Sequence, residues 1–182
     1  MPLYEHTGYA FDADEVLSLI TPKTRLLILN SPSNPTGGAA PRKEMDKLAN
    51  GLDNHPHVCI LSDEIYARML YDGQSHVSFL EYEHLRDRLI LLDGWSKTYA
   101  MTGWRIGYVL SPSSEAMEQI VKMQYYMTAC SNDAMQHAVL TAMTEARDYP
   151  ATMAAAFAER RDLICARLNA MEGVDCRIPR GA

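Results

Sequence analysis

The sequence predicts an α/β fold in which a mostly parallel, open sheet carries helices on both faces. Two observations predict it: short apolar runs bounded by turn residues recur along the chain, and segments with helical periodicity lie between and after them. Such alternation is typical of parallel sheets, whose strands are buried on both faces. The chain has 182 residues, of which 47% are hydrophobic, so it can bury a substantial core.

Four segments are expected to form the strands of this sheet. Three of them, TRLLILN, HVCILSD and LILLDG, occupy residues 24–30, 57–63 and 89–94, and the fourth, WRIGYVLS, occupies residues 104–111. The stretch SPSNPTGG at residues 31–38 contains two prolines and two glycines, and it is expected to form a loop after the first strand.

The helices are expected between and after these strands, at residues 40–52, 79–88, 113–127, 132–146 and 150–171. Pro41 suits the first turn of the first helix, and Ser113 is a suitable N-cap for the third. The last helix is expected to bury an apolar face made of Phe157, Ile164, Leu168 and Met171. A final extended piece, VDCRIP, follows it.

Composition excludes several classes of function. The net charge of −6 and the lack of a basic run argue against nucleic-acid binding. No apolar stretch approaches the roughly 20 residues of a membrane span, and the N-terminus lacks a signal-peptide layout, so a cytoplasmic protein is expected. The four cysteines show no C-x-x-C spacing and are expected to be reduced and buried, and no metal site is expected.

Polar residues follow three of the expected strands where those strands end. Asn34 lies just past the first strand, Asp63 ends the second, and Lys97 follows the third. Ligands of open parallel sheets bind at this edge, and an amine removed from water tends toward its neutral, nucleophilic form. Taken singly, each residue also has an ordinary interpretation: a solvated lysine, a capping aspartate, a turn asparagine, a packed Tyr66 or an ion-paired Arg105.

Three motifs join these positions in one pattern: NSPSNPTGG, LSDEIYARMLYDG and LDGWSKTYAMTGWRIGY. Together they resemble the pyridoxal-phosphate-dependent aminotransferases of class I and II, the aspartate aminotransferase-like group of fold type I. The resemblance covers the whole chain, although members of the family are about twice as long. It implies part of the cofactor-binding large domain at residues 1–145. Residues 146–182 would then form a helix and the start of the small C-terminal domain.

The resemblance also implies a role for each matched residue. Lys97 would form the imine (Schiff base) with the aldehyde of pyridoxal 5'-phosphate, and Asp63 would keep the pyridine nitrogen protonated. Tyr66 and Asn34 would hydrogen-bond the phenolic oxygen of the ring. Arg105 would hold the phosphate, and Ser96 would add a hydroxyl to it. The arginine with which the small domain usually binds the substrate carboxylate has no assigned counterpart here.

The activity implied is transfer of an amino group between an amino acid and a 2-oxo acid, in amino acid metabolism. Two alternatives stay open: a carbon–sulfur lyase that uses the same residues, and a non-catalytic fragment that binds cofactor or dimerises. Relatives are homodimers, and the region Met127–Gln136 is expected near the subunit boundary. We expect the 182-residue chain alone to bind the cofactor weakly and to turn over little.

Overall fold

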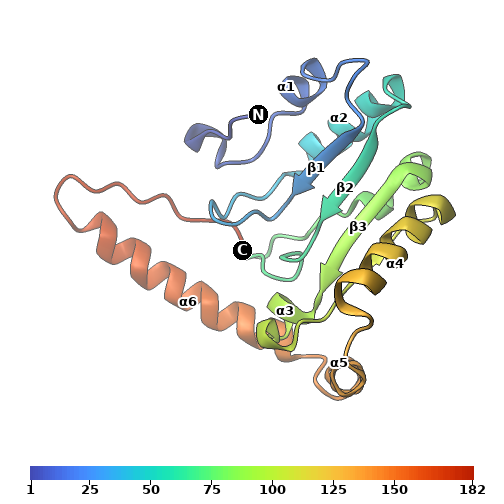
Figure 1. Ribbon diagram of the computed structural model, residues 1–182. Helices are drawn as coiled ribbons and strands as arrows, with labels where there is room; N and C mark the ends of the chain where they lie inside the picture. The colour runs from blue at the N-terminus through green and yellow to red at the C-terminus, as the bar shows by residue number, and fades with distance from the viewer.

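A computed structural model describes residues 1–182 and contains one open sheet of four strands (Figure 1). The strands are β1 (Leu26–Asn30), β2 (Cys59–Asp63), β3 (Leu89–Gly94) and β4 (Gly107–Leu110), and they lie side by side in that order. β1, β2 and β3 are parallel, whereas β4 is antiparallel to β3. The expected mostly parallel open sheet is therefore confirmed, and each strand lies inside its expected segment.

The register of the sheet brings the strand ends to one edge. Asn30 at the end of β1 pairs with Asp63 at the end of β2, and Asp63 pairs in turn with Leu92 of β3. The loop after β1 and the residues after β3 consequently leave the sheet at the same end, on either side of the end of β2. This edge is where the candidate site lies.

The main hydrophobic core lies on one face of the sheet, under α1 (Ala13–Ser18) and α2 (Arg42–Gly51). Alternate strand residues point into it and meet Leu48, Leu52 and Phe79. These strand residues are Leu29, Ile60, Leu89 and Leu91. The opposite face is less covered, because Ile28 of β1 is 65% exposed there. A smaller apolar cluster, formed by Met101, Ile106 and Val139, lies beyond β3.

Short helical turns connect the main elements. The helix expected at residues 79–88 is instead a pair of 3-10 helices, η3 (Phe79–Glu81) and η4 (Glu83–Arg88). They are separated at Tyr82, whose ψ of 90° is not helical. The remaining short elements are η1 (Glu5–Thr7), η2 (Leu52–Asn54), α3 (Trp95–Thr98) and η5 (Thr102–Trp104).

Two of the later helices begin where the sequence predicts. α4 (Ser114–Thr128) starts after Ser113, whose hydroxyl accepts a hydrogen bond from the backbone of Ala116 at 3.2 Å. α5 (Asp133–Glu145) starts after Asn132, whose side chain caps it in the same way. α4 has no buried residue, and most of the large apolar side chains in its second half are exposed: Val121, Met123, Tyr125, Tyr126 and Met127.

The buried face of α6 (Tyr149–Asn169) differs from the expected one. Ile164 and Met171 are exposed, whereas Arg161 and Cys165 are buried. Arg161 is held by a bidentate pair of hydrogen bonds to Asp72, at 2.8 and 2.9 Å, and this pairing sets which face of the helix turns inward.

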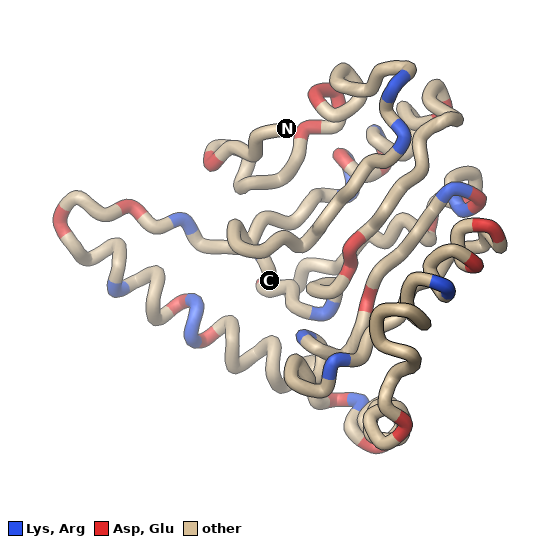
Figure 2. The backbone as a smooth tube through the Cα atoms, viewed as in Figure 1, with Lys and Arg blue, Asp and Glu red and all other residues tan.

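The cysteines differ in exposure, and the charged residues are mixed over the molecule. Cys59 and Cys130 are exposed and Cys176 is half-buried, so the expectation of four buried thiols is right for Cys165 alone. Figure 2 shows Lys and Arg spread over several elements and interspersed with Asp and Glu. No helix of the structure combines the length and the apolarity that crossing a bilayer requires.

Candidate active site

The carboxyl end of β2 carries Asp63 at the candidate site. Asp63 is half-buried, and its carboxylate accepts a hydrogen bond from the backbone N–H of Ile65 at 3.2 Å. The side chain of Asn30 donates to the Asp63 carbonyl at 3.2 Å and so fastens β1 to β2 at this edge. One carboxylate oxygen of Asp63 has no hydrogen-bond partner and remains free to pair with a ligand.

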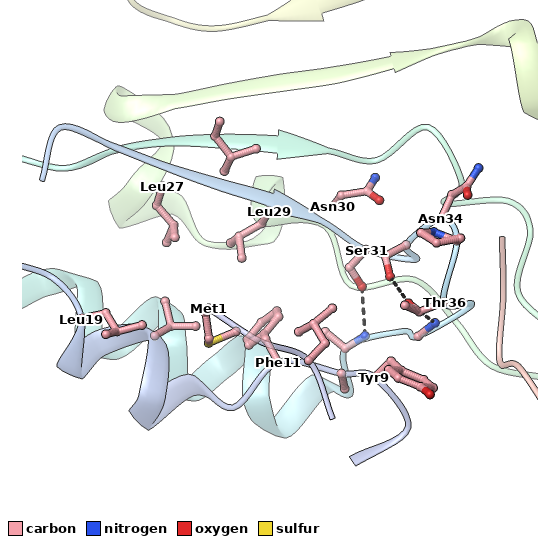
Figure 3. A pocket seen from close by; sticks show the side chains of 18 of the residues that line it. Met1, Tyr9, Phe11, Leu19, Leu27, Leu29, Asn30, Ser31, Asn34 and Thr36 are labelled. Carbon is pink, nitrogen blue, oxygen red and sulfur yellow. Dashed lines mark hydrogen bonds between the residues drawn. The ribbon is translucent and has the colours of Figure 1, made fainter. Parts of the chain in front are cut away.

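The loop after β1 positions Asn34. Gly37 donates its N–H to the carbonyl of Ser33 at 2.8 Å, and the hydroxyls of Ser33 and Thr36 lie 2.6 Å apart, which closes the loop on itself. Figure 3 shows Asn34 beyond these bonds, with its amide pointing away from them. That amide donates to the Tyr66 hydroxyl oxygen at 2.9 Å, so the phenolic proton of Tyr66 remains available to another acceptor.

Lys97 lies on the short helix α3 that follows β3. Its side chain is half-buried and takes part in none of the ion pairs of the molecule. The ammonium nitrogen lies 5.5 Å from the centre of the Tyr66 ring, in a cation–π arrangement. Three segments far apart in the sequence thus bring together Asn34, Tyr66 and Lys97.

Arg105 and Ser96 are less closely joined to this group. The Arg105 side chain is exposed, and its guanidinium donates to the carbonyl of Thr102 at 3.0 Å. The backbone carbonyl of Ser96 accepts a hydrogen bond from the Thr102 hydroxyl at 3.0 Å, so Thr102 contacts both residues. No hydrogen bond or ion pair connects Arg105 to Lys97 or Asp63.

Glu64 is a buried carboxylate beside the site that the sequence reasoning missed. It is 5% exposed and accepts hydrogen bonds from the hydroxyls of Ser62 and Ser78, the backbone of Phe79 and Nε2 of His76. Burial by itself would raise the pKa of Glu64, but these donors, led by His76, outweigh it and hold the pKa below its ordinary value. The signal that was available is strand alternation, since Glu64 has the same parity as the buried Ile60.

A second pair of titratable groups lies across β3 and β4. The Tyr108 hydroxyl donates to Asp93 at 3.0 Å, and burial raises the pKa of Asp93 above its usual range. Burial and the neighbouring Asp93 also raise the pKa of Tyr108 to about 12. The pair therefore contributes a hydrogen bond between β3 and β4, with the tyrosine protonated at neutral pH.

A cavity with a volume of about 480 Å³ runs beside β1 and reaches the site only at Asn34 (Figure 3). Its walls are mainly apolar, with Phe11, Leu19 and Leu27 among them. Asp63, Tyr66, Lys97 and Arg105 do not line it. It is thus a groove along β1, an outermost strand of the sheet, and it is separate from the group around Lys97. No cluster of three or more His, Cys, Asp and Glu is placed to hold a metal ion.

The side chains at the strand ends fit a particular kind of ligand. An amine without an ion-pair partner suits an aldehyde, and a phenol with a free proton suits a phenolate oxygen. A carboxylate with an open oxygen suits a protonated ring nitrogen. This set of groups fits pyridoxal 5'-phosphate, which carries all three complementary functions.

The chain is similar to known proteins along its whole length. A family model described as aminotransferase class I and II matches residues 1–182. The chain is 39% identical to an aspartate aminotransferase of Rhizobium meliloti (strain 1021), over 97% of the chain and 43% of that protein. It is 36% identical to aromatic-amino-acid aminotransferase 2 of Thermococcus litoralis, over 100% of the chain and 46% of that protein.

Solved structures show the same similarity. The crystal structure of the aspartate aminotransferase from Rhizobium meliloti superposes with a TM-score of 0.94 at 38% identity, covering 100% of this chain and 46% of the other. An aromatic aminotransferase from Pyrococcus horikoshii superposes with a TM-score of 0.91 at 37% identity, covering 100% of this chain and 48% of the other. The chain thus spans less than half the length of these relatives. Over the whole of that span, it belongs to the class I and II aminotransferase family.

Proposed function

We propose that the protein to which this chain belongs moves amino groups between an amino acid and a 2-oxo acid, using pyridoxal 5'-phosphate held by Lys97. The observation that carries the proposal is a half-buried amine without an ion-pair partner, 5.5 Å from the Tyr66 ring. It lies at the sheet edge where β2 presents Asp63. The family membership of the chain supports the same reaction class.

Pyridoxal 5'-phosphate supplies an aldehyde for amine exchange and a cationic ring that withdraws electrons from the substrate α-carbon. Lys97 has two tasks in this chemistry. Its Nζ would hold the cofactor between turnovers. When it is not bonded to the cofactor, the same nitrogen would take the proton from the substrate α-carbon and return it as a general acid.

The other side chains orient the cofactor and adjust its charge. Asp63 would hold the proton on the ring nitrogen with its open carboxylate oxygen. Tyr66 would donate its phenolic proton to the ring oxygen, because its own oxygen already accepts from Asn34 at 2.9 Å. Arg105 would bind the phosphate in a bidentate manner, with the Ser96 hydroxyl as an additional donor.

We further propose a homodimer with its contact near Met127–Gln136. The end of α4 supports this, because Tyr125, Tyr126 and Met127 are all exposed there. Large exposed apolar patches mark interaction sites on soluble proteins. From the resemblance to the family, we also propose that residues 1–145 belong to the large domain and that residues 146–182 form a helix and the start of the small domain. The helix α6 starts at Tyr149, just beyond that boundary.

A carbon–sulfur lyase would use the same lysine, aspartate and arginine, and it remains the second candidate. The relatives named above are aminotransferases, which supports transamination over elimination. In an assay of the protein to which this chain belongs, with amino acid and 2-oxo acid together, we expect amino-group exchange without release of sulfide or ammonia. Release of either product in place of exchange would favour the lyase.

Reductive trapping tests the assignment of Lys97. We expect borohydride reduction after incubation with pyridoxal 5'-phosphate to leave a pyridoxyl group on Lys97, and peptide mass spectrometry would locate it. The exposed Lys43 and Lys122 are controls in the same chain. A label spread evenly over the lysines, or retained in full by the Lys97→Ala variant, would contradict the proposal.

A further inference from the structure

Two cysteines of the C-terminal region lie close enough to react with each other. The sulfur of Cys165 on α6 is 3.8 Å from the sulfur of Cys176 in the segment that follows the helix. A disulfide bond is about 2.05 Å long, so a modest side-chain rotation and a small approach of the segment would join the two sulfurs. Neither cysteine contacts the group around Lys97, and the proposed function uses neither of them.

The structure holds this pair together by contacts other than the sulfurs themselves. The side chain of Asn169 bonds the backbone of Cys176 twice, accepting from its N–H at 2.6 Å and donating to its carbonyl at 2.9 Å. Gly173, with φ of 76°, allows the chain to turn back along α6 between the two cysteines. The approach of Cys176 to Cys165 is thus built into the local fold.

The two thiols differ in access to solvent. Cys165 is 3% exposed, and burial together with the hydrogen bond from Cys176 raises its pKa. Cys176 is half-buried and faces outward more than its partner. Thiol–disulfide exchange begins with attack by an accessible thiolate, so Cys176 is the residue that an external disulfide would meet first.

We propose that Cys165 and Cys176 form a reversible dithiol–disulfide site, with a small-molecule disulfide such as glutathione disulfide as the oxidant. The thiolate of Cys176 attacks one sulfur of glutathione disulfide, forms a mixed disulfide and releases one glutathione thiolate. Cys165 then loses its proton to solvent and attacks the Cys176 sulfur, which releases the second glutathione. Two protein thiols are oxidised, and one glutathione disulfide is reduced to two thiols.

The site is connected to the loop that carries Asn34. After Cys176, the backbone N–H groups of Arg180 and Gly181 both donate to the carbonyl of Gly37, at 2.9 and 3.1 Å. Figure 1 shows this segment returning from the far end of α6 toward the loop after β1. A bond between Cys165 and Cys176 would therefore fix the start of a segment whose end supports the candidate active site.

Peptide mapping of the 182-residue chain tests the proposal directly. After treatment with glutathione disulfide and alkylation of free thiols, trypsin cleaves at Arg167 and separates Cys165 from Cys176. We expect a disulfide-linked pair of the peptides 162–167 and 168–177, reversible by dithiothreitol. It should exceed any linkage of Cys59 or Cys130 by at least about tenfold, because the two sulfurs are held at high effective concentration.

Single variants distinguish the attacking thiol, Cys176, from the resolving thiol, Cys165. Cys165→Ser should accumulate a stable glutathione adduct on Cys176, because no resolving thiol remains, whereas Cys176→Ser should leave Cys165 largely unmodified. The double variant Cys59→Ser/Cys130→Ser is the matched control and should form the linked pair as the unaltered chain does. Free, alkylated Cys165 and Cys176 in the unaltered chain, at glutathione ratios that modify Cys59 or Cys130, would overturn the proposal.

Discussion

Asp63 and Glu64 are neighbours in the chain but point to opposite sides of the sheet, as successive strand residues do. Asp63 is half-buried at the sheet edge and keeps one oxygen without a partner, whereas Glu64 is buried and accepts four hydrogen bonds. The dipeptide thus supplies one carboxylate that can meet a ligand and one that fastens the end of β2 to the segment around Ser78.

Replacing Glu64 should change both the stability and its dependence on pH. The Glu64→Gln variant lacks the charge that His76, Ser62 and Ser78 stabilise, so we expect it to lose about 2 kcal/mol of unfolding free energy at pH 7. The folded protein holds the pKa of Glu64 below its ordinary value of 4.5. The stabilisation is therefore complete above that value and is lost as the pH falls through the folded-state pKa.

Urea denaturation at a series of pH values measures this effect. Between about pH 5 and pH 3, the unfolding free energy of the unaltered chain should fall more steeply than that of Glu64→Gln. Glu159→Gln is the control, because Glu159 is exposed on α6 and forms no ion pair. Parallel curves for the unaltered chain and Glu64→Gln would show that the carboxylate has no such role.

The position of a single residue can be predicted from the sequence when its neighbours in the chain determine it. Asn34, Asp63 and Lys97 follow apolar runs directly, so their common edge could be predicted from strand ends alone. Three of the four donors to Glu64 come from His76, Ser78 and Phe79, 12 to 15 residues further on. No local pattern reports that such a distant segment will fold back onto the strand.

Among the elements, the loop between β1 and α2 depends most on glycine. Gly37 has φ of 66°, and a Cβ added there would lie 2.3 Å from the Cβ of Pro179 and 2.9 Å from the carbonyl oxygen of Gly181. The loop and the C-terminal segment approach so closely that only a residue without a side chain fits. The position of Asn34 therefore depends on packing against a segment that is remote in the sequence.

Gly37→Ala should destabilise the chain for two reasons: a left-handed backbone conformation and the overlap with Pro179. We expect a loss of about 3 kcal/mol in unfolding free energy, combining both effects. Gly73→Ala is the matched control, since Gly73 has φ of 70° but nothing within 4 Å of the added Cβ. It should lose only about 1 kcal/mol. Equal losses in the two variants would exclude a contribution from the contact with Pro179.

For the long helix α6, hydrophobic periodicity predicts the wrong buried face. Its apolar residues predict one buried face, yet the structure buries Arg161 and exposes Ile164. Arg161 pairs with Asp72, which is 89 residues away, and its guanidinium lies 4.8 Å from the centre of the Tyr71 ring. A bidentate ion pair and a cation–π contact thus orient the helix, and neither is visible in a hydrophobic pattern.

For the molecule as a whole, the exposed end of α4 has a consequence for association. Tyr126 and Met127 are 74% and 73% exposed, although both are large and apolar. We expect the chain to self-associate through this region, and Tyr126→Glu/Met127→Glu should shift it toward monomer in sedimentation velocity. The Tyr4→Glu variant changes an exposed tyrosine at the other end of the chain and should leave the distribution unchanged. Unaltered sedimentation of the double variant would place the association elsewhere.

The antiparallel pairing of β4 with β3 has a further effect on the two cations of the site. Gly94 pairs with Gly107, and a Cβ on Gly94 would lie 2.9 Å from the Cα of Gly107. Lys97 follows Gly94 in the chain and Arg105 precedes Gly107, so both residues belong to the segment that connects β3 to β4. The close contact of Gly94 with Gly107 therefore fixes where the segment that carries both cations begins and ends, and a slip of the ladder would move Arg105 relative to Lys97.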